Sequence, residues 1–209
     1  MLVKVCGITR LEDAQAAVEA GAGAIGFIFW PKSPRFIDPH RARAIAAALP
    51  PFITTVGVFV NQPAEYVNGV ASLARLGAVQ LHGDETIDDI TPIARPIMKA
   101  IALNGSTEPA GVDAWPARVT MLLDVHDEEH RGGTGRTIDW ALAAKIAARR
   151  RSMLAGGLTP ANVAVAVGRV RPFGIDVSSG VEQSPGIKDH GRIRALFEEI
   201  HGVDYAARS

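Results

Sequence analysis

Short apolar segments rich in β-branched residues recur along this chain, and Ala-rich segments with helical spacing separate most of them. The eight candidate strands span residues 2–8, 24–29, 54–60, 78–83, 97–103, 119–125, 152–157 and 174–180. Candidate helices span residues 11–22, 38–50, 62–77, 85–96, 139–150 and 159–170. Strands that alternate with helices in this way are typical of a parallel sheet covered by helices.

Several of these helices carry recognisable end signals. Asp38 is a favoured N-cap residue and is followed by proline, and Thr159 precedes Pro160 in the same way. The segment 85–96 is a weaker candidate because Pro92 interrupts it, and the segment after strand 97–103 predicts only a short or irregular turn.

Eight regular units in 209 residues predict a closed (β/α)₈ barrel, also called a TIM barrel, of small size. No linker, low-complexity tract or charge block divides the chain, so we expect residues 1–209 to form one catalytic barrel domain. An open sheet of about six strands, with two units misassigned, is the alternative.

The composition is that of an ordinary globular protein, with 47% hydrophobic residues. Lys and Arg balance Asp and Glu at 22 each, so a nucleic-acid or anionic-membrane partner is not expected. The chain shows no signal-peptide pattern and no apolar run near the roughly 20 residues that span a bilayer. A lone cysteine suits a reducing compartment, and we expect a cytoplasmic protein. The sequence leaves open whether it is a monomer or a homodimer.

In a barrel of this kind, the chemistry is expected at the carboxyl ends of the strands and in the loops that follow them. The polar, thiol and glycine residues at these positions are Cys6, Arg35, His82, Asp124, Gly156, Gly157, Asp176, Ser178, Ser179 and Gly180.

Two of these loops predict a phosphate site. Gly156 and Gly157 lie between a strand and a helix, and Ser178, Ser179 and Gly180 follow the last strand. Exposed backbone N–H groups and small side chains bind anions without any basic residue, and these loops are the usual phosphate site of barrel enzymes. The alternative is that the glycines only permit tight turns.

The long charged loop 126–138 ends in a glycine-rich stretch, so we expect it to act as a lid or to supply further backbone donors through Gly132, Gly133 and Gly135. A solvated surface insertion is the alternative.

Two motifs in the sequence resemble known signatures but are misleading. "GAGAIG" at 21–26 follows a helix rather than a strand, and "HDEEH" at 126–130 departs from the zinc-protease pattern, so neither predicts a dinucleotide or metal site.

Cys6 and Asp124 are the candidate reactive groups. Asp124 ends an apolar strand, where burial would raise the pKa of its carboxyl group and suit it to act as a general acid. Lys4 lies two residues before Cys6 and therefore on the same face of the strand, so we expect its charge to favour the Cys6 thiolate. Taken alone, a single cysteine is more often core filler.

The chain resembles the phosphoribosylanthranilate isomerase family. The resemblance rests on "KVCGIT", "FWPKSPR", "VGVFVN", "QLHGDE", "LLD", "GGTGRTIDW", "AGGLTPANV" and "DVSSGVE" with "PGIKDH", in this order from residue 3 to about residue 190. It implies a (β/α)₈ fold and an Amadori rearrangement of an aminoaldose phosphate in tryptophan biosynthesis, without metal or organic cofactor.

The resemblance also implies roles for individual residues. Cys6 would be the general base and Asp124 the general acid. Arg35 would bind the anthranilate carboxylate, Asp176 would position the sugar or the amine, and His82 would contact the substrate. The phosphate-binding residues would be Gly133, Gly135, Gly156, Gly157, Ser178, Ser179 and Gly180.

Two alternatives to this function remain open from the sequence. An isomerase of the histidine pathway catalyses the same rearrangement, but it typically uses two aspartates, whereas the first strand here ends in Cys6. A phosphate-ligand binding module that has lost the chemistry is the second alternative, and the presence of both Cys6 and Asp124 argues against it.

Overall fold

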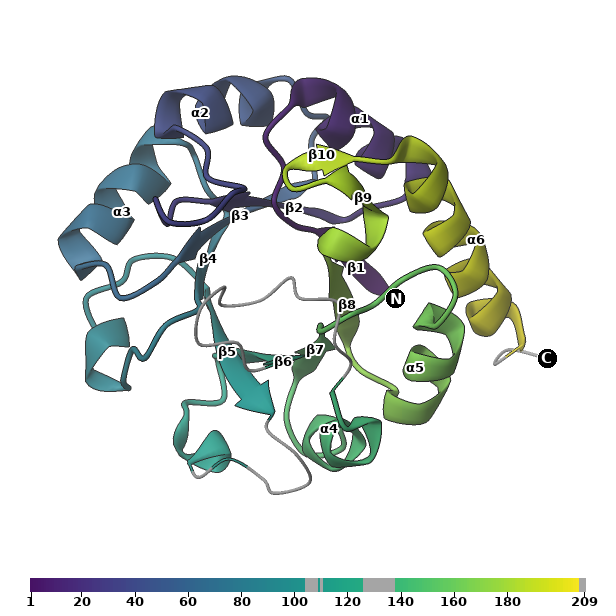
Figure 1. Cartoon of the computed structure of the whole chain (residues 1–209). Helices are drawn as coiled ribbons and strands as arrows, with labels where there is room; N and C mark the ends of the chain where they lie inside the picture. Colours follow the sequence, from purple (N-terminus) through teal and green to yellow (C-terminus); the bar gives the residue numbers. More distant parts are fainter. Residues whose placement is uncertain (104–108, 110, 126–137, 207–209) are drawn as a thin grey trace.

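The computed structural model describes residues 1–103, 109, 111–125 and 138–206. Eight parallel strands form a closed barrel in chain order, with helices around it (Figure 1). The strands are β1 (Leu2–Val5), β2 (Ala24–Ile28), β3 (Thr54–Phe59), β4 (Ala78–Leu81), β5 (Ile97–Leu103), β6 (Thr120–Val125), β7 (Ser152–Leu154) and β8 (Gly174–Val177). The predicted barrel is therefore confirmed, and the open-sheet alternative is wrong.

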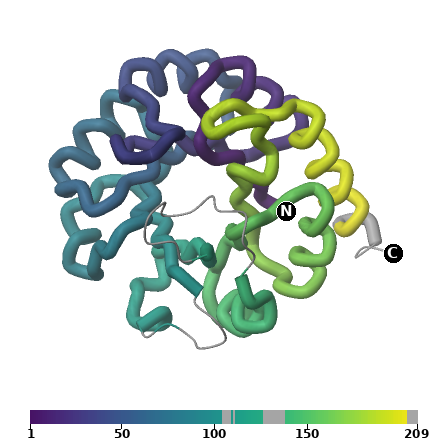
Figure 2. Tube along the Cα trace, in the orientation of Figure 1, coloured from purple at the N-terminus to yellow at the C-terminus, as the bar shows by residue number. Residues whose placement is uncertain are grey.

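The barrel closes where β8 pairs with β1, with Lys4 opposite Asp176 in the register. Figure 2 shows how the chain runs around the ring, so that its first and last helical segments end up next to each other. This closure brings residues separated by more than 170 positions in the sequence into contact at the barrel axis.

The helices outside the barrel follow most of the predicted segments. They are α1 (Leu11–Ala20), α2 (Pro39–Ala47), α3 (Ala64–Leu73), α4 (Trp140–Ala147), α5 (Val163–Val170) and α6 (His190–Ala206). Asp38 caps α2 by accepting hydrogen bonds from the N–H groups of His40 and Arg41, as its position predicts. None of the described helices is long and apolar enough to cross a membrane.

Three segments differ from the sequence prediction. Only a single 3₁₀ turn, Asp88–Ile90, forms in the weak segment 85–96. Helix α5 begins at Val163 rather than after Thr159. The reason is a turn held by the Asn162 side chain, which accepts a hydrogen bond from the Thr159 N–H and donates one to the Gly157 carbonyl. The segment after β8 contains elements that the pattern did not predict: a 3₁₀ turn, η3 (Ser179–Val181), a short hairpin of β9 (Glu182–Ser184) and β10 (Ile187–Lys188), and α6.

Alternation along the strands separates two buried regions. A large apolar core lies between the barrel and its helices and includes outward-facing residues such as Val3, Val5 and Ile25. A small apolar cluster of Met98, Leu122, Met153 and Ala155 has Leu2 and Ala100 packed against it. Strand periodicity places these residues on the inward face, which they share with the polar side chains described next.

Candidate active site

A pocket opens at the carboxyl ends of the barrel strands. Its lining includes all the predicted site residues that the structure describes: Cys6, Arg35, His82, Asp124, Gly156, Gly157, Asp176, Ser178, Ser179 and Gly180. The predicted Gly133 and Gly135, and the rest of the loop 126–137, lie outside the described residues. The topology thus brings together side chains and loops that are spread over nearly the whole sequence.

Cys6 lies just beyond β1 and is 5% exposed. Gly26 on the neighbouring strand makes room for it, since a Cβ atom there would lie 2.7 Å from the Cys6 Sγ and 3.0 Å from the Lys4 Cε. Gly7, at φ +73°, turns the chain away immediately after Cys6. A side chain at Gly7 would collide with Arg35, so this glycine lets Arg35 lie across the end of β1.

The environment of the Cys6 thiol contains opposing influences. Burial raises its pKa, whereas the Lys4 ammonium lowers it and Lys188 lowers it further. The net pKa of the thiol lies above its ordinary value. Lys4 therefore acts in the expected direction, and burial together with the Asp176 charge outweighs the nearby cations.

Lys4 and Asp176 form a buried ion pair on the inner face of the barrel. The Lys4 Nζ lies 2.7 Å from the Asp176 Oδ2, and Lys4 is fully buried. Burial alone would lower the pKa of Lys4, but Asp176 and Cys6 hold it above its ordinary value, so Lys4 remains charged. The second oxygen of Asp176, Oδ1, is buried and has no hydrogen-bond partner among the described residues.

Asp124 lies near the end of β6 and is 8% exposed. Its Oδ1 accepts a 2.7 Å hydrogen bond from the Val125 N–H. Burial raises the pKa of its carboxyl group to about 7, with Val125 and Lys4 lowering it and the Asp176 charge raising it. A carboxyl group with this pKa is protonated in a large fraction of molecules near neutral pH, as a general acid requires.

Two further side chains connect the inner ion pair to Asp124. The Gln80 Oε1 accepts a 2.8 Å hydrogen bond from the Lys4 Nζ, and the Gln80 Nε2 lies 2.7 Å from the His82 Nδ1. The other ring nitrogen of His82, Nε2, lies 3.5 Å from the Asp124 Oδ2. Sequence reasoning missed Gln80. The signal that could have revealed it is its position two residues before His82, which places both side chains on the same face of the strand.

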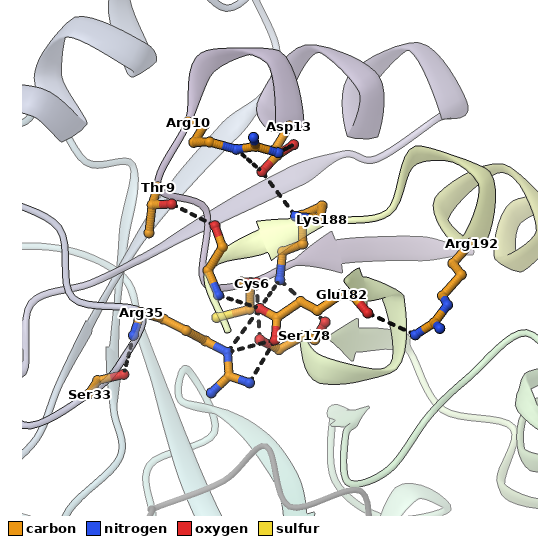
Figure 3. Close-up of polar contacts among 11 residues, drawn as sticks. Cys6, Thr9, Arg10, Asp13, Ser33, Arg35, Ser178, Glu182, Lys188 and Arg192 are labelled. Carbon is orange, nitrogen blue, oxygen red and sulfur yellow. Dashed lines mark hydrogen bonds and ion pairs between the residues drawn. The ribbon is translucent and has the colours of Figure 1, made fainter. Parts of the chain in front are cut away.

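Arg35 enters the pocket from the loop after β2 and is held by Glu182 (Figure 3). Its Nε lies 2.9 and 3.1 Å from the two Glu182 oxygens, and its Nη2 lies 2.7 Å from Oε2. The Lys188 Nζ donates to the Glu182 Oε1, at 2.8 Å, and to the Ser178 carbonyl. Burial alone would raise the pKa of Glu182, but Arg35 and Lys188 lower it below its ordinary value.

The β9–β10 hairpin thus anchors Arg35 at the barrel mouth, and it is itself fixed to α1. Asp13, buried in that helix, accepts hydrogen bonds from the Lys188 N–H and from the side chains of Arg10 and His190 (Figure 3 shows the first two). Sequence reasoning assigned no role to Glu182 or Lys188, because only the folded hairpin brings them to Arg35.

The two glycine-containing loops lie side by side in the pocket wall. Gly156 and Gly157 both have positive φ, and their N–H groups make no hydrogen bond within the described part of the chain. Gly180 packs directly against the Leu158 carbonyl, where any Cβ atom would overlap it. Ser179 and Gly180 form the first turn of η3, where N–H groups have no partner inside the helix. The arrangement offers several backbone donors to an anion.

Another part of the pocket wall is apolar and includes Ile28, Trp30, Val58 and Val60. This wall shares the pocket with Arg35, so the pocket combines a hydrophobic surface with a guanidinium group. Such a combination suits an aromatic ring that carries a carboxylate. Among the described residues, no group of three or more His, Cys, Asp or Glu side chains is arranged to hold a metal ion.

Comparison with known proteins gives consistent matches over nearly the whole chain. A family model described as N-(5'phosphoribosyl)anthranilate (PRA) isomerase matches residues 3–199. The N-(5'-phosphoribosyl)anthranilate isomerase of Pseudomonas fluorescens (strain Pf0-1) is 50% identical over 198 residues, covering 94% of this chain and 97% of that protein.

Solved structures agree with the sequence matches. Phosphoribosyl anthranilate isomerase from Thermotoga maritima is 45% identical, with a TM-score of 0.89 over 97% of this chain and 99% of that chain. A phosphoribosyl anthranilate isomerase in complex with reduced 1-(o-carboxyphenylamino)-1-deoxyribulose 5-phosphate is 43% identical. Its TM-score is 0.85, over 97% of this chain and 100% of that chain.

Proposed function

This chain belongs to the N-(5'-phosphoribosyl)anthranilate isomerase family, and from that premise we propose how its pocket isomerises N-(5'-phosphoribosyl)anthranilate in tryptophan biosynthesis. In this proposal Asp124 is the general acid and Cys6 is the general base. The observation that carries it is that these two buried groups line one pocket together with Arg35 and two loops rich in backbone donors.

Asp124 begins the reaction. Its carboxylic acid donates a proton to the furanose ring oxygen, and the bond between that oxygen and C1′ breaks. The lone pair of the anthranilate nitrogen forms a double bond to C1′, which leaves an iminium ion. A pKa of about 7 supports this role, because the proton is still bound near neutral pH and is readily given up.

Cys6 completes the rearrangement. The positive iminium acidifies the C2′ proton, which the Cys6 thiolate removes. The electrons of the broken C–H bond form a C1′–C2′ double bond and neutralise the iminium nitrogen. The resulting enolamine gains a proton at C1′ and loses one from the C2′ hydroxyl to give the ketone. An acid or base of this kind contributes about 10²- to 10⁴-fold to the rate.

The other pocket residues support binding of a substrate with an aromatic carboxylate at one end and a phosphate at the other. Arg35 would bind the carboxylate beside the apolar wall. Asp176 Oδ1, which has no hydrogen-bond partner among the described residues, would accept a hydrogen bond from a sugar hydroxyl or the amine. His82 would contact the substrate. The phosphate would bind the backbone donors of Gly156, Gly157 and Ser178–Gly180, with Gly133 and Gly135 proposed from the sequence alone. The ligand in the 43% identical relative carries both a carboxyl group and a phosphate.

Binding energy from the phosphate end can be used to orient the reacting carbons, since the phosphate takes no part in bond breaking. The chemistry described needs no metal ion or organic cofactor. Assembly as a monomer or a homodimer stays a prediction.

The test is the fluorescence of N-(5'-phosphoribosyl)anthranilate, generated in situ and followed with purified protein in EDTA. We expect a rapid loss of fluorescence that depends on protein concentration. A decay no faster than in buffer contradicts the proposal. Parallel turnover of the histidine-pathway aminoaldose phosphate then distinguishes that isomerase from a binding module without activity.

A further inference from the structure

A line of three polar contacts crosses the barrel mouth from the buried ion pair to Asp124. Lys4 contacts Gln80 at 2.8 Å, Gln80 contacts His82 at 2.7 Å, and His82 faces Asp124 at 3.5 Å. Gln80 is 1% exposed, so protein groups rather than water determine its hydrogen bonds.

The hydrogen atoms in this line follow from the chemistry of each group. A lysine ammonium only donates, so the Gln80 atom that faces Lys4 is its carbonyl oxygen. The amide NH₂ of Gln80 must then face His82, and this group also only donates. The His82 Nδ1 is therefore the acceptor, and the imidazole carries its proton on Nε2. An imidazolium, or the Nδ1–H tautomer, would oppose N–H to N–H at 2.7 Å.

The Nε2 atom of His82 lies 3.5 Å from the Asp124 Oδ2. The Asp124 Oδ1 already accepts from the Val125 N–H, and the His82 Nε2 faces the other oxygen, Oδ2. Both oxygens thus face donors, an arrangement that stabilises the carboxylate more than the carboxylic acid. The opposite tautomer would direct a lone pair at the carboxylate and destabilise it.

We propose that Lys4 and Gln80 are positioning residues that hold His82 as the neutral Nε2–H tautomer, so that it offers a hydrogen-bond donor to Asp124 as this group loses its proton. The assignment of the tautomer stands independently, whereas its effect on turnover rests on the proposed role of Asp124 as general acid. His82 then promotes proton transfer without changing its own charge.

The ¹⁵N shifts of the histidine side chains test the tautomer directly in the wild-type protein, with the His82 signals assigned by their absence in His82→Gln. We expect a non-protonated Nδ1 and a protonated Nε2 at neutral pH. In Gln80→Glu, the new carboxylate accepts from Lys4 and also from His82, so Nδ1 becomes protonated. Gln15→Glu is the matched control, since Gln15 lies exposed on α1, and its His82 shifts should equal those of the wild type.

Steady-state kinetics of the same variants test the consequence. We expect kcat of Gln80→Glu to fall by at least about tenfold, as for one charge-assisted hydrogen bond lost in the transition state, and Gln15→Glu to keep its activity. Gln80→Met has a side chain of similar size that lacks the donor. We expect this variant to show a mixture of the two His82 tautomers and a kcat between those of the wild type and Gln80→Glu.

A protonated Nδ1 in the wild type overturns the proposal, and this measurement does not depend on any variant folding. A tautomer that changes in Gln80→Glu while kcat stays at the wild-type value overturns the positioning role. A wild type that shows the Nε2–H tautomer but does not turn over N-(5'-phosphoribosyl)anthranilate contradicts the proposed function and supports the assignment of the tautomer.

Discussion

The Lys4 ammonium lies 2.7 Å from the Asp176 carboxylate inside the barrel, and the two residues are register partners where β8 closes on β1. Lys4→Met leaves a buried carboxylate without its cation. We expect a loss of about 3–5 kcal/mol in the free energy of unfolding, measured with urea. The double variant Lys4→Met with Asp176→Asn should recover much of this loss. If Lys4→Met alone lowers the free energy of unfolding by less than about 1 kcal/mol, the ion pair does not stabilise the fold.

The two pKa values determine the pH dependence of turnover. Activity needs a protonated Asp124 and a deprotonated Cys6, and the Cys6 pKa lies above its ordinary value while that of Asp124 is about 7. When the base has the higher pKa, the active form reaches its maximum between the two values. We therefore expect kcat/KM to rise up to about pH 7 and to fall only above the raised pKa of Cys6.

A pH titration of kcat/KM in one mixed buffer at constant ionic strength checks this prediction. A profile that is level from about pH 5 to about pH 7 and then falls would mean that Cys6 ionises well below Asp124. In that case the cations Lys4 and Lys188 would outweigh the effect of burial.

The ionised Asp124 side chain should lower the free energy of unfolding at neutral and alkaline pH. Its pKa is about 7 when folded and near 3.8 when unfolded, so the folded state binds the proton more tightly. The associated stability is complete below about pH 4 and is lost as the pH rises through about 7, up to about 4 kcal/mol in total. Asp124→Asn should therefore be more stable than the wild type at pH 8 and equal to it near pH 4, by urea unfolding. Equal stability of the two proteins at both pH values would be inconsistent with a buried acid at this position.

Glu182 should act on substrate binding through Arg35. In Glu182→Gln, the amide cannot accept the two-pronged contact of the guanidinium, so Arg35 loses its fixed orientation. We expect KM to rise roughly tenfold with a smaller change in kcat, as for the loss of a charge-assisted contact. Glu198→Gln, an exposed change on α6, is the matched control. An unchanged KM in Glu182→Gln would remove Arg35 from the binding site or Glu182 from its support.

The barrel and most positions of the pocket lining could be predicted from the sequence because they depend on local patterns. Most strands are short apolar runs that contain β-branched residues, and the carboxyl end of each strand is fixed once the barrel is assumed. Cys6, Asp124 and Asp176 therefore reach one pocket without any knowledge of side-chain contacts.

The contacts that tune the site could not be predicted in this way. Glu182 contacts both Arg35 and Lys188 only because the hairpin folds back over α1. The contact between Glu182 and Arg35 spans 147 positions of sequence. The orientation of the Gln80 amide depends on Lys4 from another strand. The direction of the Cys6 pKa shift depends on whether burial or the nearby cations have the larger effect. Strand spacing predicts that Lys4 lies near Cys6, but it does not give the effect of burial on the thiol.

The most direct test of the acid and base assignments is the turnover of Cys6→Ala and Asp124→Asn with N-(5'-phosphoribosyl)anthranilate, compared with wild type at its pH optimum. The assignments predict that kcat falls by about 10²- to 10⁴-fold in each variant, while both remain folded and their KM changes little. A kcat near the wild-type value in either folded variant would contradict the role given to that residue.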